Sequence, residues 1–353
     1  MNICIIAPID EKIPPKFYGG IGRIINVLVE GLAQKKHNVT LLAPENTETS
    51  ARLIPIIKRP LEANNHENNN DPETREIFFK SSIKKIKEVL ENEKFDIVNN
   101  HLGWRLVPFN NIIDPPIITT LHTPINQGNR RIVFSNFKEA PVISTSNNQR
   151  KALPNINYLE TIYNGIDISL YSLSEKYYDY LVFLGRMSPE KGVLEAIQIA
   201  KKLEIKLILA GAIHEWDKNY FTTKIKPNID NKKIIFLGEI DDIQKNKLLG
   251  GAKALLAPIQ WDEPFGLTFI ESMACGAPVI ALNRGSAQEV IINGVTGIIA
   301  NSIPEIYKRF KEINEISRKK CRLYVEEKFN SNVMVNNYEK TYYSYLKKHE
   351  KIK

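Results

Sequence analysis

The sequence of 353 residues is poor in cysteine, and its cysteines follow no ligand or disulfide pattern. Cys4, Cys275 and Cys321 lie far apart among apolar neighbours, and no Cys-x-x-Cys pair occurs. This spacing favours neither a zinc site nor a disulfide framework, and isolated thiols of this kind are typical of a reducing compartment. We therefore expect a cytoplasmic protein.

Long apolar runs are also missing. The longest, such as residues 3–7 and 254–258, fall far short of the ~18–20 residues that span a bilayer. The first eight residues carry neither a basic leader nor a small-residue cleavage site, so they are interpreted as a first strand and not as a signal peptide. No membrane-spanning segment is expected.

Positive charge is in excess, with a formal net charge of +8. Such a surplus favours anionic partners, which include nucleic acid, acidic membrane surfaces and phosphorylated ligands. The sequence has no zinc finger, RNA-binding aromatic signature or basic helix with heptads, so nucleic acid is not expected. Part of the excess lies near the C-terminus, at 318–320, 347–348 and 351–353. These runs predict either a solvated face or a peripheral contact with anionic lipid at the inner face of a membrane.

Short apolar segments alternate with amphipathic helical stretches along nearly the whole chain. Apolar strands separated by helices indicate parallel sheets that are covered by helices. The strands expected in the first half are 3–7, 39–43, 96–99, 117–121 and 141–145. Those expected in the second half are 181–185, 206–210, 233–237, 254–257, 278–281 and 296–300. Helices are expected at 21–36 and 81–93, and near residues 188, 215, 241, 266, 286 and 303. We therefore predict an α/β protein with two Rossmann-like, doubly wound domains that face a central cleft.

The turn Asn-Gly-Ile-Asp at 164–167 separates the two series of strands. It divides the chain into a domain at 1–166 and a domain at 167–330. A last helix at about 331–349 carries Tyr338, Tyr342 and Tyr345 on one face, which we expect to pack back against the first domain. The Asn-rich segment 62–71 lacks apolar anchors and is interpreted as a loop.

The most specific motif is WDEPFGLTFIESMACGAPV at 261–279. It follows an expected strand, and Pro264 suits the entry to a helix. The first amide groups of that helix, at about 266–268, lack intrahelical partners and lie at the positive end of the helix dipole, so they can bind phosphate oxygens. Glu271 lies four residues after Leu267, about 6 Å further along the axis, which is roughly the span from a diphosphate to a ribose.

Carboxylates and cations complete this expected site. Glu263, just before the helix, would lie beside a sugar, although it could also be an ordinary carboxylate at a helix start. Arg186 and Lys191 belong to the motif GRMSPEKG, which follows another strand, and are placed to neutralise a diphosphate unless they are merely solvated. Cations directed at a departing diphosphate would lower the barrier to glycosidic bond cleavage.

Together these motifs resemble the family 4 retaining glycosyltransferases of the GT-B fold. The resemblance is carried by the Glu-x7-Glu pair Glu263 and Glu271 within EPFGL, by Arg186 and Lys191, and by the sequence YGGIGR that begins at Tyr18. It covers nearly the whole chain.

The resemblance implies a role for each matching residue. Glu263 contacts donor sugar hydroxyls, Glu271 contacts the ribose, and the backbone around Gly238 and Ile240 brackets the base. His122, at the end of a strand, contacts the sugar near the reacting carbon. The implied catalytic residues are His122, Glu263, Arg186 and Lys191. The implied donor-binding residues are Gly20, Arg186, Lys191, Gly238, Ile240, Glu263, Phe265, Gly266, Leu267, Thr268 and Glu271. The implied acceptor-side residues are Tyr18, Gly19 and His101, whereas His37 is implied to be structural.

The implied activity is that of a retaining hexosyltransferase that moves a sugar from a nucleotide diphosphate sugar, with a UDP-sugar expected first, to an acceptor in glycolipid, polysaccharide or small-molecule glycoside synthesis. No Asp-x-Asp sequence occurs and cationic side chains face the phosphates, so no obligatory metal or other cofactor is expected.

Three alternatives stay open at this stage. A nucleotide-sugar epimerase would share the fold and the nucleotide pocket, and fold alone cannot separate the two enzymes. A dinucleotide-dependent oxidoreductase is disfavoured, because Ile25 stands where a third glycine of Gly-x-Gly-x-x-Gly belongs. A non-catalytic binding protein would keep the fold without turnover.

Overall fold

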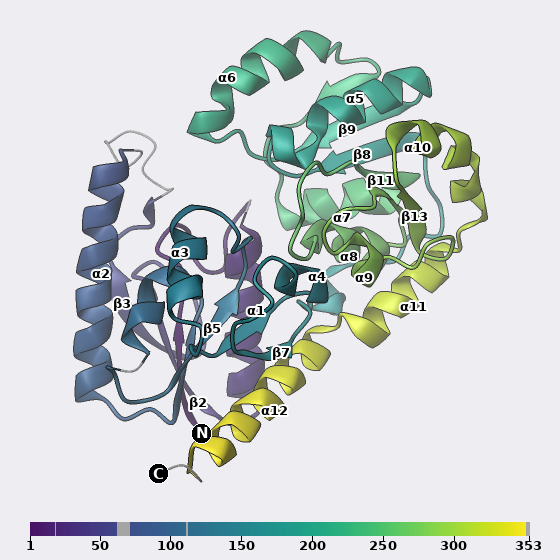
Figure 1. The fold of residues 1–353 in the computed structure, drawn as a ribbon. Coiled ribbons are helices and arrows are strands. Elements are labelled where there is room, and N and C mark those ends of the chain that lie inside the picture. Colours follow the sequence, from purple (N-terminus) through teal and green to yellow (C-terminus); the bar gives the residue numbers. More distant parts are fainter. Residues whose placement is uncertain (18, 62–70, 111, 351–353) are drawn as a thin grey trace. The chain divides into compact units, whose positions relative to one another are not determined.

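The computed structural model describes residues 1–17, 19–61, 71–110 and 112–350. Tyr18 and most of the Asn-rich segment, residues 62–70, lie outside the described residues. The chain forms two compact units (Figure 1). The first combines Met1–Gly165 with Ser331–Lys353, and the second consists of Ile166–Asn330.

A parallel sheet forms the centre of the first unit. Its strands are β1 (Asn2–Ile6), β2 (Asn38–Pro44), β3 (Arg52–Ile57), β4 (Ile97–Asn100), β5 (Ile117–Leu121), β6 (Val142–Ser144) and β7 (Tyr158–Thr161). Within the described residues they lie in the order β3-β2-β1-β4-β5-β6-β7, and every pairing is parallel. The order reverses between β1 and β4, and ligands of open α/β sheets bind beyond the carboxyl ends of the strands at such a point.

Helices cover the faces of this sheet. They are α1 (Gly20–Gln34), α2 (Pro72–Asn92), the short helix η2 (Trp104–Phe109), α3 (Gly128–Asn136), α4 (Asn147–Arg150) and α12 (Ser331–Glu350). Helix α1 forms because apolar residues at three- and four-residue spacing, among them Ile24, Leu28 and Leu32, are buried on one face. Helix α2 begins where the Asp71 carboxylate accepts a hydrogen bond from the Thr74 amide.

The last helix, α12, packs on the first unit through an apolar and aromatic face. Tyr338 and Tyr342 are fully buried, and Val335 packs so closely on Gly31 of α1 that a β-carbon there would lie 2.6 Å from Val335 Cγ2. At the edge of this contact, His37 Nε2 lies 2.8 Å from the Glu339 carboxylate.

The second unit repeats the doubly wound plan. Its strands are β8 (Tyr180–Leu184), β9 (Lys206–Ala210), β10 (Ile234–Phe236), β11 (Ala254–Ala257), β12 (Val279–Leu282) and β13 (Gly297–Ala300). Within the described residues the order is β10-β9-β8-β11-β12-β13, again all parallel, so the order reverses between β8 and β11. Two parallel α/β sheets confirm the predicted fold class.

Helices and short turns connect these strands. The α-helices are α5 (Val193–Lys202), α6 (Lys218–Tyr220), α7 (Asp242–Gly251), α8 (Leu267–Ala274), α9 (Ala287–Val290), α10 (Ile303–Arg309) and α11 (Arg318–Lys328). The shorter turns are η3 (Ile168–Leu170), η4 (Pro189–Lys191), η5 (Glu215–Asp217), η6 (Phe221–Ile225), η7 (Lys226–Asn228) and η8 (Phe310–Glu315). The first and last residues of the second unit lie side by side, and the Ile166 amide donates a hydrogen bond to the Phe329 carbonyl at 2.9 Å.

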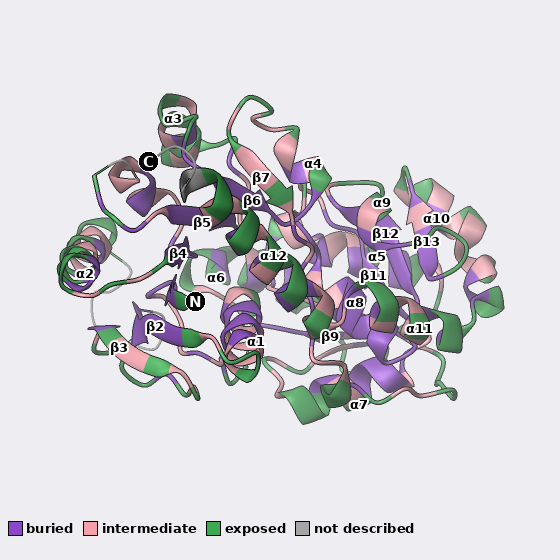
Figure 2. Ribbon diagram, turned by 90° about the horizontal axis from the view of Figure 1, so that it is seen from below, coloured by how far each residue is buried: buried purple, intermediate pink, exposed green. Residues whose placement is uncertain are grey.

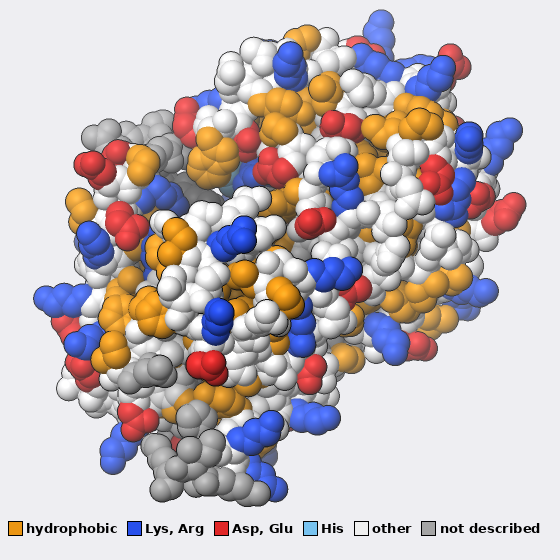
Figure 3. Space-filling model, in the orientation of Figure 1, with side chains coloured by type: hydrophobic (Ala, Val, Ile, Leu, Met, Phe, Trp, Pro, Cys, Tyr) orange, Lys and Arg blue, Asp and Glu red, His pale blue; other side chains and the backbone are white. Residues whose placement is uncertain are grey.

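Burial follows this layering, since the strands are mostly buried and the surface helices expose one face (Figure 2). The three cysteines are free and buried, and burial raises the pKa of Cys275 and of Cys321 to about 12. Among the described residues, no helix combines the length and apolar character that would let it cross a membrane. Lys and Arg side chains are scattered over the face in Figure 3, with acidic side chains among them.

One residue of the basic run at 318–320 is not solvated, which corrects the sequence interpretation. Arg318 is 8% exposed and opens α11. Its guanidinium donates hydrogen bonds to the carbonyl oxygens of Ser174, Gly250, Ala252 and Cys275 at 2.6–3.3 Å. The cation therefore ties four backbone carbonyls together inside the second unit.

Candidate functional site

In the second unit, the strands next to the reversal of strand order bring the cationic motif and the Glu263 loop together. Lys191 ends η4, which follows β8, and Glu263 lies in the loop after β11. Lys191 Nζ is 2.5 Å from Glu263 Oε2, and the indole N–H of Trp261 donates to the same oxygen at 2.8 Å. The Lys191 ammonium also lies 5.1 Å from the centre of the Trp261 ring. All three side chains are partly buried, so the ion pair is only partly screened by water.

Arg186 lies on the same edge but has different partners. Its guanidinium forms ion pairs with Glu190 and, at 3.2 Å from Nε, with Asp217. Burial raises the pKa of the Asp217 carboxyl, and the positive charge of Arg186 partly offsets that rise. The Trp216 ring lies 6.0 Å from the guanidinium. The two predicted diphosphate ligands, Arg186 and Lys191, are therefore both held by carboxylates in this state.

The loop that carries Glu263 is braced by its neighbours. The Ser286 amide donates to the Glu263 carbonyl at 3.0 Å, and Arg284 Nη1 donates to the Gln260 carbonyl at 2.6 Å. On the other side, the Gln260 amide donates to the Glu190 carbonyl at 2.8 Å. The backbone of residues 260–263 is thus fixed to both the 284–286 turn and the cationic motif.

Helix α8 begins at Leu267, one residue after Gly266, where the expected group of free amides began. Gly266 is its N-cap and Leu267 its first residue, so the amides of Leu267 and Thr268 lie in the first turn and have no intrahelical partner. Phe265 is buried and makes an edge-on contact with Phe329 at 5.7 Å between ring centres. This packing anchors the start of α8, which lies directly after the Glu263 loop.

Glu271, the second carboxylate of the motif, is buried on α8 and is 3% exposed. One of its oxygens, Oε1, lies 2.5 Å from Lys245 Nζ and accepts a hydrogen bond from the Tyr171 hydroxyl at 2.8 Å. Lys245 also pairs with Asp242 at 3.1 Å. Within the described residues, the side-chain partners of Glu271 are therefore Lys245 and Tyr171.

Gly238 and Ile240 follow β10, next to the loop that follows β9. The Gly211 amide donates to the Gly238 carbonyl at 2.8 Å, and the Gly185 amide donates to the Ala210 carbonyl at 3.0 Å. Gly238 and Ile240 are half-buried. These backbone contacts place the predicted base-binding loop beside the strand ends that carry the cationic motif.

In the first unit, both predicted histidines lie at the carboxyl ends of central strands and contact each other. His101 follows β4 and His122 follows β5. His101 Nδ1 lies 2.8 Å from His122 Nε2, and His101 Nε2 lies 2.8 Å from Asn99 Oδ1. Burial lowers the pKa of His122 to about 4, and burial together with His122 lowers the pKa of His101 well below its ordinary value. Both rings are therefore neutral at neutral pH.

The glycine-rich loop after β1 leads into α1. Gly19 is buried and is the N-cap of α1, whereas Gly20 is exposed and is its first residue. The Glu11 carboxylate accepts a hydrogen bond from the Gly22 amide at 2.6 Å. The positive end of α1 is thus already bound by a carboxylate of the same unit, at the loop where the resemblance implies that Gly20 binds the donor.

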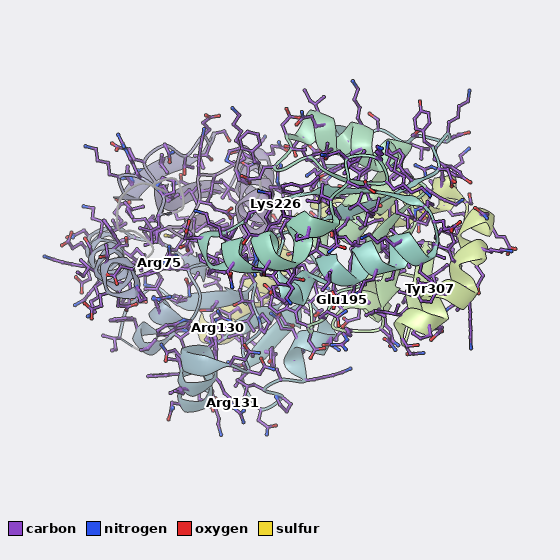
Figure 4. The ribbon with its side chains drawn as sticks, turned by 90° about the horizontal axis from the view of Figure 1, so that it is seen from above. Arg75, Arg130, Arg131, Glu195, Lys226 and Tyr307 are labelled. Atoms are coloured by element: carbon purple, nitrogen blue, oxygen red, sulfur yellow. The ribbon has the colours of Figure 1, made fainter. Side chains whose placement is uncertain are left out.

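Two arginines of the first unit form ion pairs with carboxylates. Arg75 on α2 pairs with Asp10, and Arg105 pairs with Glu76 at 3.1 Å while lying 3.7 Å from the centre of the Phe79 ring. Figure 4 labels Arg75, as well as Arg130 on α3. Burial and the nearby Arg105 lower the pKa of Arg130.

Sequence reasoning gave no role to several residues that contact the predicted ones, among them Asn99, Tyr171, Asp217, Lys245 and Trp261. Asn99 had a visible signal, since an asparagine inside a strand that is buried on both faces needs hydrogen-bond partners. Lys245 is the counter-charge of a carboxylate 26 residues away, which no local spacing reveals.

The part of the chain that the structure describes contains no group of three or more His, Cys, Asp or Glu side chains arranged to hold a metal ion. Whether the reaction needs a metal stays a prediction, because a cation can also be carried in by substrate phosphates.

Each of the two units matches the model of a known protein family. The model of Glycosyltransferase Family 4 matches residues 18–170, and the model of Glycosyl transferases group 1 matches residues 172–325. The chain therefore belongs to the family 4 glycosyltransferases of the GT-B type. The resemblance inferred from the motifs, and the expectation of an enzyme, are confirmed.

Individual relatives agree with this assignment over most of their length. An uncharacterised glycosyltransferase of Methanocaldococcus jannaschii is 24% identical over 341 residues, which covers 83% of this chain and 84% of that protein. Sucrose-phosphate synthase from Thermosynechococcus elongatus has a TM-score of 0.81 at 18% identity and covers 97% of this chain and 98% of that one. Anabaena HepE in complex with UDP-glucose has a TM-score of 0.70 at 18% identity, with coverage of 97% and 99%. Likeness to structures at this identity shows the shared fold.

Proposed function

We propose that the protein transfers a sugar from a nucleotide diphosphate sugar, a UDP-sugar first, to an acceptor with retention of the anomeric configuration. The observation that carries the proposal is the convergence of Lys191, Glu263 and the start of α8 at the reversal of strand order of the second sheet. The uridine preference is supported by HepE, which is similar in fold and was solved with UDP-glucose. Retention is supported by the resemblance to retaining members of family 4.

The donor is proposed to bind on the second unit. Its diphosphate would accept hydrogen bonds from the amides of Leu267 and Thr268 and would pair with Lys191 and Arg186, which exchange their internal carboxylates for phosphate oxygens. Glu271 would accept hydrogen bonds from the ribose hydroxyls while Lys245 compensates its charge. The base would lie beside Gly238 and Ile240.

Cleavage of the glycosidic bond leaves the electron pair on the diphosphate oxygen. Lys191 and Arg186 would stabilise this growing negative charge, and one such donor is worth roughly 3–4 kcal/mol in related chemistry. Glu263 would orient the sugar hydroxyls. The acceptor hydroxyl would attack from the side on which the diphosphate departs, and its proton would pass to the departing diphosphate oxygen. His122 would contact the donor sugar near the reacting carbon. No obligatory metal is part of the proposal.

Donor binding is the first test. Thermal unfolding is measured with UDP, GDP and ADP and with their sugars, because a ligand at 100 times its dissociation constant adds about 2.7 kcal/mol to the free energy of unfolding. We expect one diphosphate to stabilise the protein without divalent metal and equally well in EDTA. Absence of a shift with every nucleotide would contradict the proposal.

Turnover is the second test. The donor that binds is incubated alone and with acceptor candidates, and the anomeric configuration of the product is read by proton NMR. Transfer with retention is expected. An inverted product would contradict the proposed mechanism, and an isomerised donor in the absence of acceptor would indicate an epimerase.

A further inference from the structure

A line of hydrogen bonds runs through the core of the first unit, from α12 to the end of β5. The Tyr342 hydroxyl donates to Asn99 Oδ1 at 2.7 Å, and His101 Nε2 lies 2.8 Å from the same oxygen. His101 Nδ1 then lies 2.8 Å from His122 Nε2. Tyr342, Asn99 and His101 are buried, whereas His122 at the end of the line is partly exposed.

The orientation of the Asn99 amide is settled by its other contacts. Asn99 Nδ2 donates to the Ile118 carbonyl at 3.1 Å and to Thr120 Oγ1 at 3.0 Å. A backbone carbonyl can only accept a hydrogen bond, so the nitrogen of the amide must face Ile118. Its oxygen therefore faces Tyr342 and His101, and both of these groups must donate.

The proton on His101 follows from this orientation. Because His101 Nε2 donates to Asn99, the neutral ring carries its hydrogen on Nε2 and a lone pair on Nδ1. That lone pair faces His122 Nε2, so His122 must donate from Nε2. The two rings are inclined by only 25° with centres 5.0 Å apart, a geometry that permits this edge-to-edge bond.

His122 is left with one acceptor. A neutral imidazole that donates from Nε2 carries its free lone pair on Nδ1. Within the described residues His122 makes no hydrogen bond other than the one to His101. The hydrogen-bond and ring partners of the histidine pair are Asn99, Tyr338 and, through Asn99, Tyr342, none of which is charged at neutral pH.

We propose that Asn99, His101 and Tyr342 are positioning residues that hold His122 in the Nε2–H tautomer, so that His122 Nδ1 accepts a hydrogen bond from a hydroxyl group of the bound sugar. This step rests on the proposed function, in which His122 contacts the sugar. The tautomer also decides which group of the donor can lie beside His122. The lone pair on Nδ1 attracts an O–H donor and repels a phosphate or carboxylate oxygen, so His122 faces a hydroxyl and not the diphosphate.

The tautomer can be measured without any ligand. Histidine-selective ¹⁵N labelling and long-range ¹H–¹⁵N correlation spectra at pH 7 distinguish a protonated from an unprotonated ring nitrogen, and His101→Gln and His122→Gln assign the signals. We expect both histidines to be neutral, with hydrogen on Nε2. A His122 signal with hydrogen on Nδ1, or an imidazolium, would overturn the proposal.

Asn99→Leu removes the group that orients the pair. His101 can then carry its hydrogen on Nδ1 and donate to His122, which moves the His122 hydrogen to Nδ1 and removes the acceptor. We expect mixed tautomers and a kcat about tenfold lower, the size of one net hydrogen bond. Tyr342→Phe leaves His101 bonded to Asn99, so it should keep the tautomers and lose less activity.

Asn100→Leu is the matched control. Asn100 is as buried as Asn99, lies next to it on β4, and likewise donates to one carbonyl (Gly103) and one threonine hydroxyl (Thr119). It should lower thermal stability as Asn99→Leu does, yet leave the histidine spectra unchanged and kcat closer to wild type. Identical spectra and kcat for the two variants would overturn the proposal. Failure of every donor to bind or turn over would instead contradict the proposed function, while the ligand-free spectra still decide the tautomer.

Discussion

Lys191 and Glu263 are 72 residues apart in the sequence and form an ion pair in which Lys191 Nζ lies 2.5 Å from Glu263 Oε2. Trp261 donates a second hydrogen bond to that oxygen. Both donors bind Oε2, and within the described residues Oε1 accepts no hydrogen bond. Before any donor arrives, the proposed sugar-binding carboxylate is thus held by Lys191 and Trp261.

Glu263→Gln should lower kcat on the order of 100-fold, because the neutral amide loses the charge-assisted hydrogen bonds to the sugar that strengthen in the transition state. Its effect on the free energy of unfolding should be small, since the side chain is only partly buried. Steady-state kinetics and thermal unfolding measure the two effects. Trp261→Phe keeps a ring beside Lys191 but removes the indole donor, and an intermediate loss of kcat is expected. Wild-type activity in Glu263→Gln would contradict the assignment.

Glu271→Gln should abolish the thermal shift produced by the nucleotide diphosphate, because a neutral amide binds the ribose hydroxyls more weakly. Glu271→Ala would also remove the shift. Both variants leave the buried Lys245 ammonium without its main counter-charge, a loss of roughly 3–5 kcal/mol in such pairs, although the glutamine amide oxygen can still accept a hydrogen bond from Lys245. Each variant is therefore compared with its own ligand-free midpoint. A full shift in Glu271→Gln would rule out the ribose role.

Gly285→Ala should lower activity by moving the Glu263 loop. A β-carbon at Gly285 would lie 2.3 Å from the Glu263 amide nitrogen, and the backbone there has φ +55°. Gly294→Ala is the control, because Gly294 also has positive φ, at +78°, yet a β-carbon there meets nothing within 4 Å. Both variants should lose about 1 kcal/mol through backbone strain, and Gly285→Ala should lose more, because its β-carbon meets the Glu263 backbone. Only Gly285→Ala should also lose activity. Equal kcat values in the two variants would contradict the inference that Gly285 positions the Glu263 loop.

Arg318→Leu should lower the free energy of unfolding by roughly 3–5 kcal/mol, since four carbonyl oxygens lose a charged donor. The neighbouring Lys319 and Lys320 are exposed, so their alanine variants should stay within about 0.5 kcal/mol of wild type. Urea denaturation provides the values. A mild effect at Arg318 would mean that the carbonyls find other donors.

Acid should destabilise the folded protein through its buried histidines. Burial lowers the pKa of His122 and of His214 to about 4, below the ordinary value of 6.5. Between these values the unfolded chain binds more protons than the folded protein, so the free energy of unfolding falls as the pH is lowered from about 6.5 to about 4. We expect a loss of roughly 3 kcal/mol from His122, measured by urea denaturation across that range. His122→Gln should show a shallower fall, and an unchanged slope would argue against the lowered pKa.

The sequence predicted the sheets well where strands are buried on both faces. β11 and β12 are continuous apolar runs and β1 is apolar after Asn2, and an apolar run between turn signals predicts a central strand. The edge strands β3 and β7 were not predicted, because β3 carries Pro55 inside its apolar run and β7 mixes polar with apolar residues. Helix α2 was predicted too short, since its first turns from Pro72 carry Glu73, Arg75 and Glu76 and show little apolar periodicity.

The sequence placed candidate site residues where they share one short motif. Glu263 and Glu271 share one motif, and Arg186 and Lys191 share another, so spacing alone placed each pair on one loop or helix start. The partners that orient them were not predictable, because Lys245 and Tyr171 come from elements far away in the sequence. Long-range pairs of this kind depend on the packing of whole elements.

The position of α12 has a consequence for a shortened chain. Tyr338 and Tyr342 complete the interior of the first unit, yet they are synthesised after all of Ile166–Asn330. Without α12 the first unit would lack its closing helix and expose apolar surface, whereas the second unit would be complete. A chain truncated after Asn330 should therefore contain one finished unit and one unfinished unit, which limited proteolysis would distinguish.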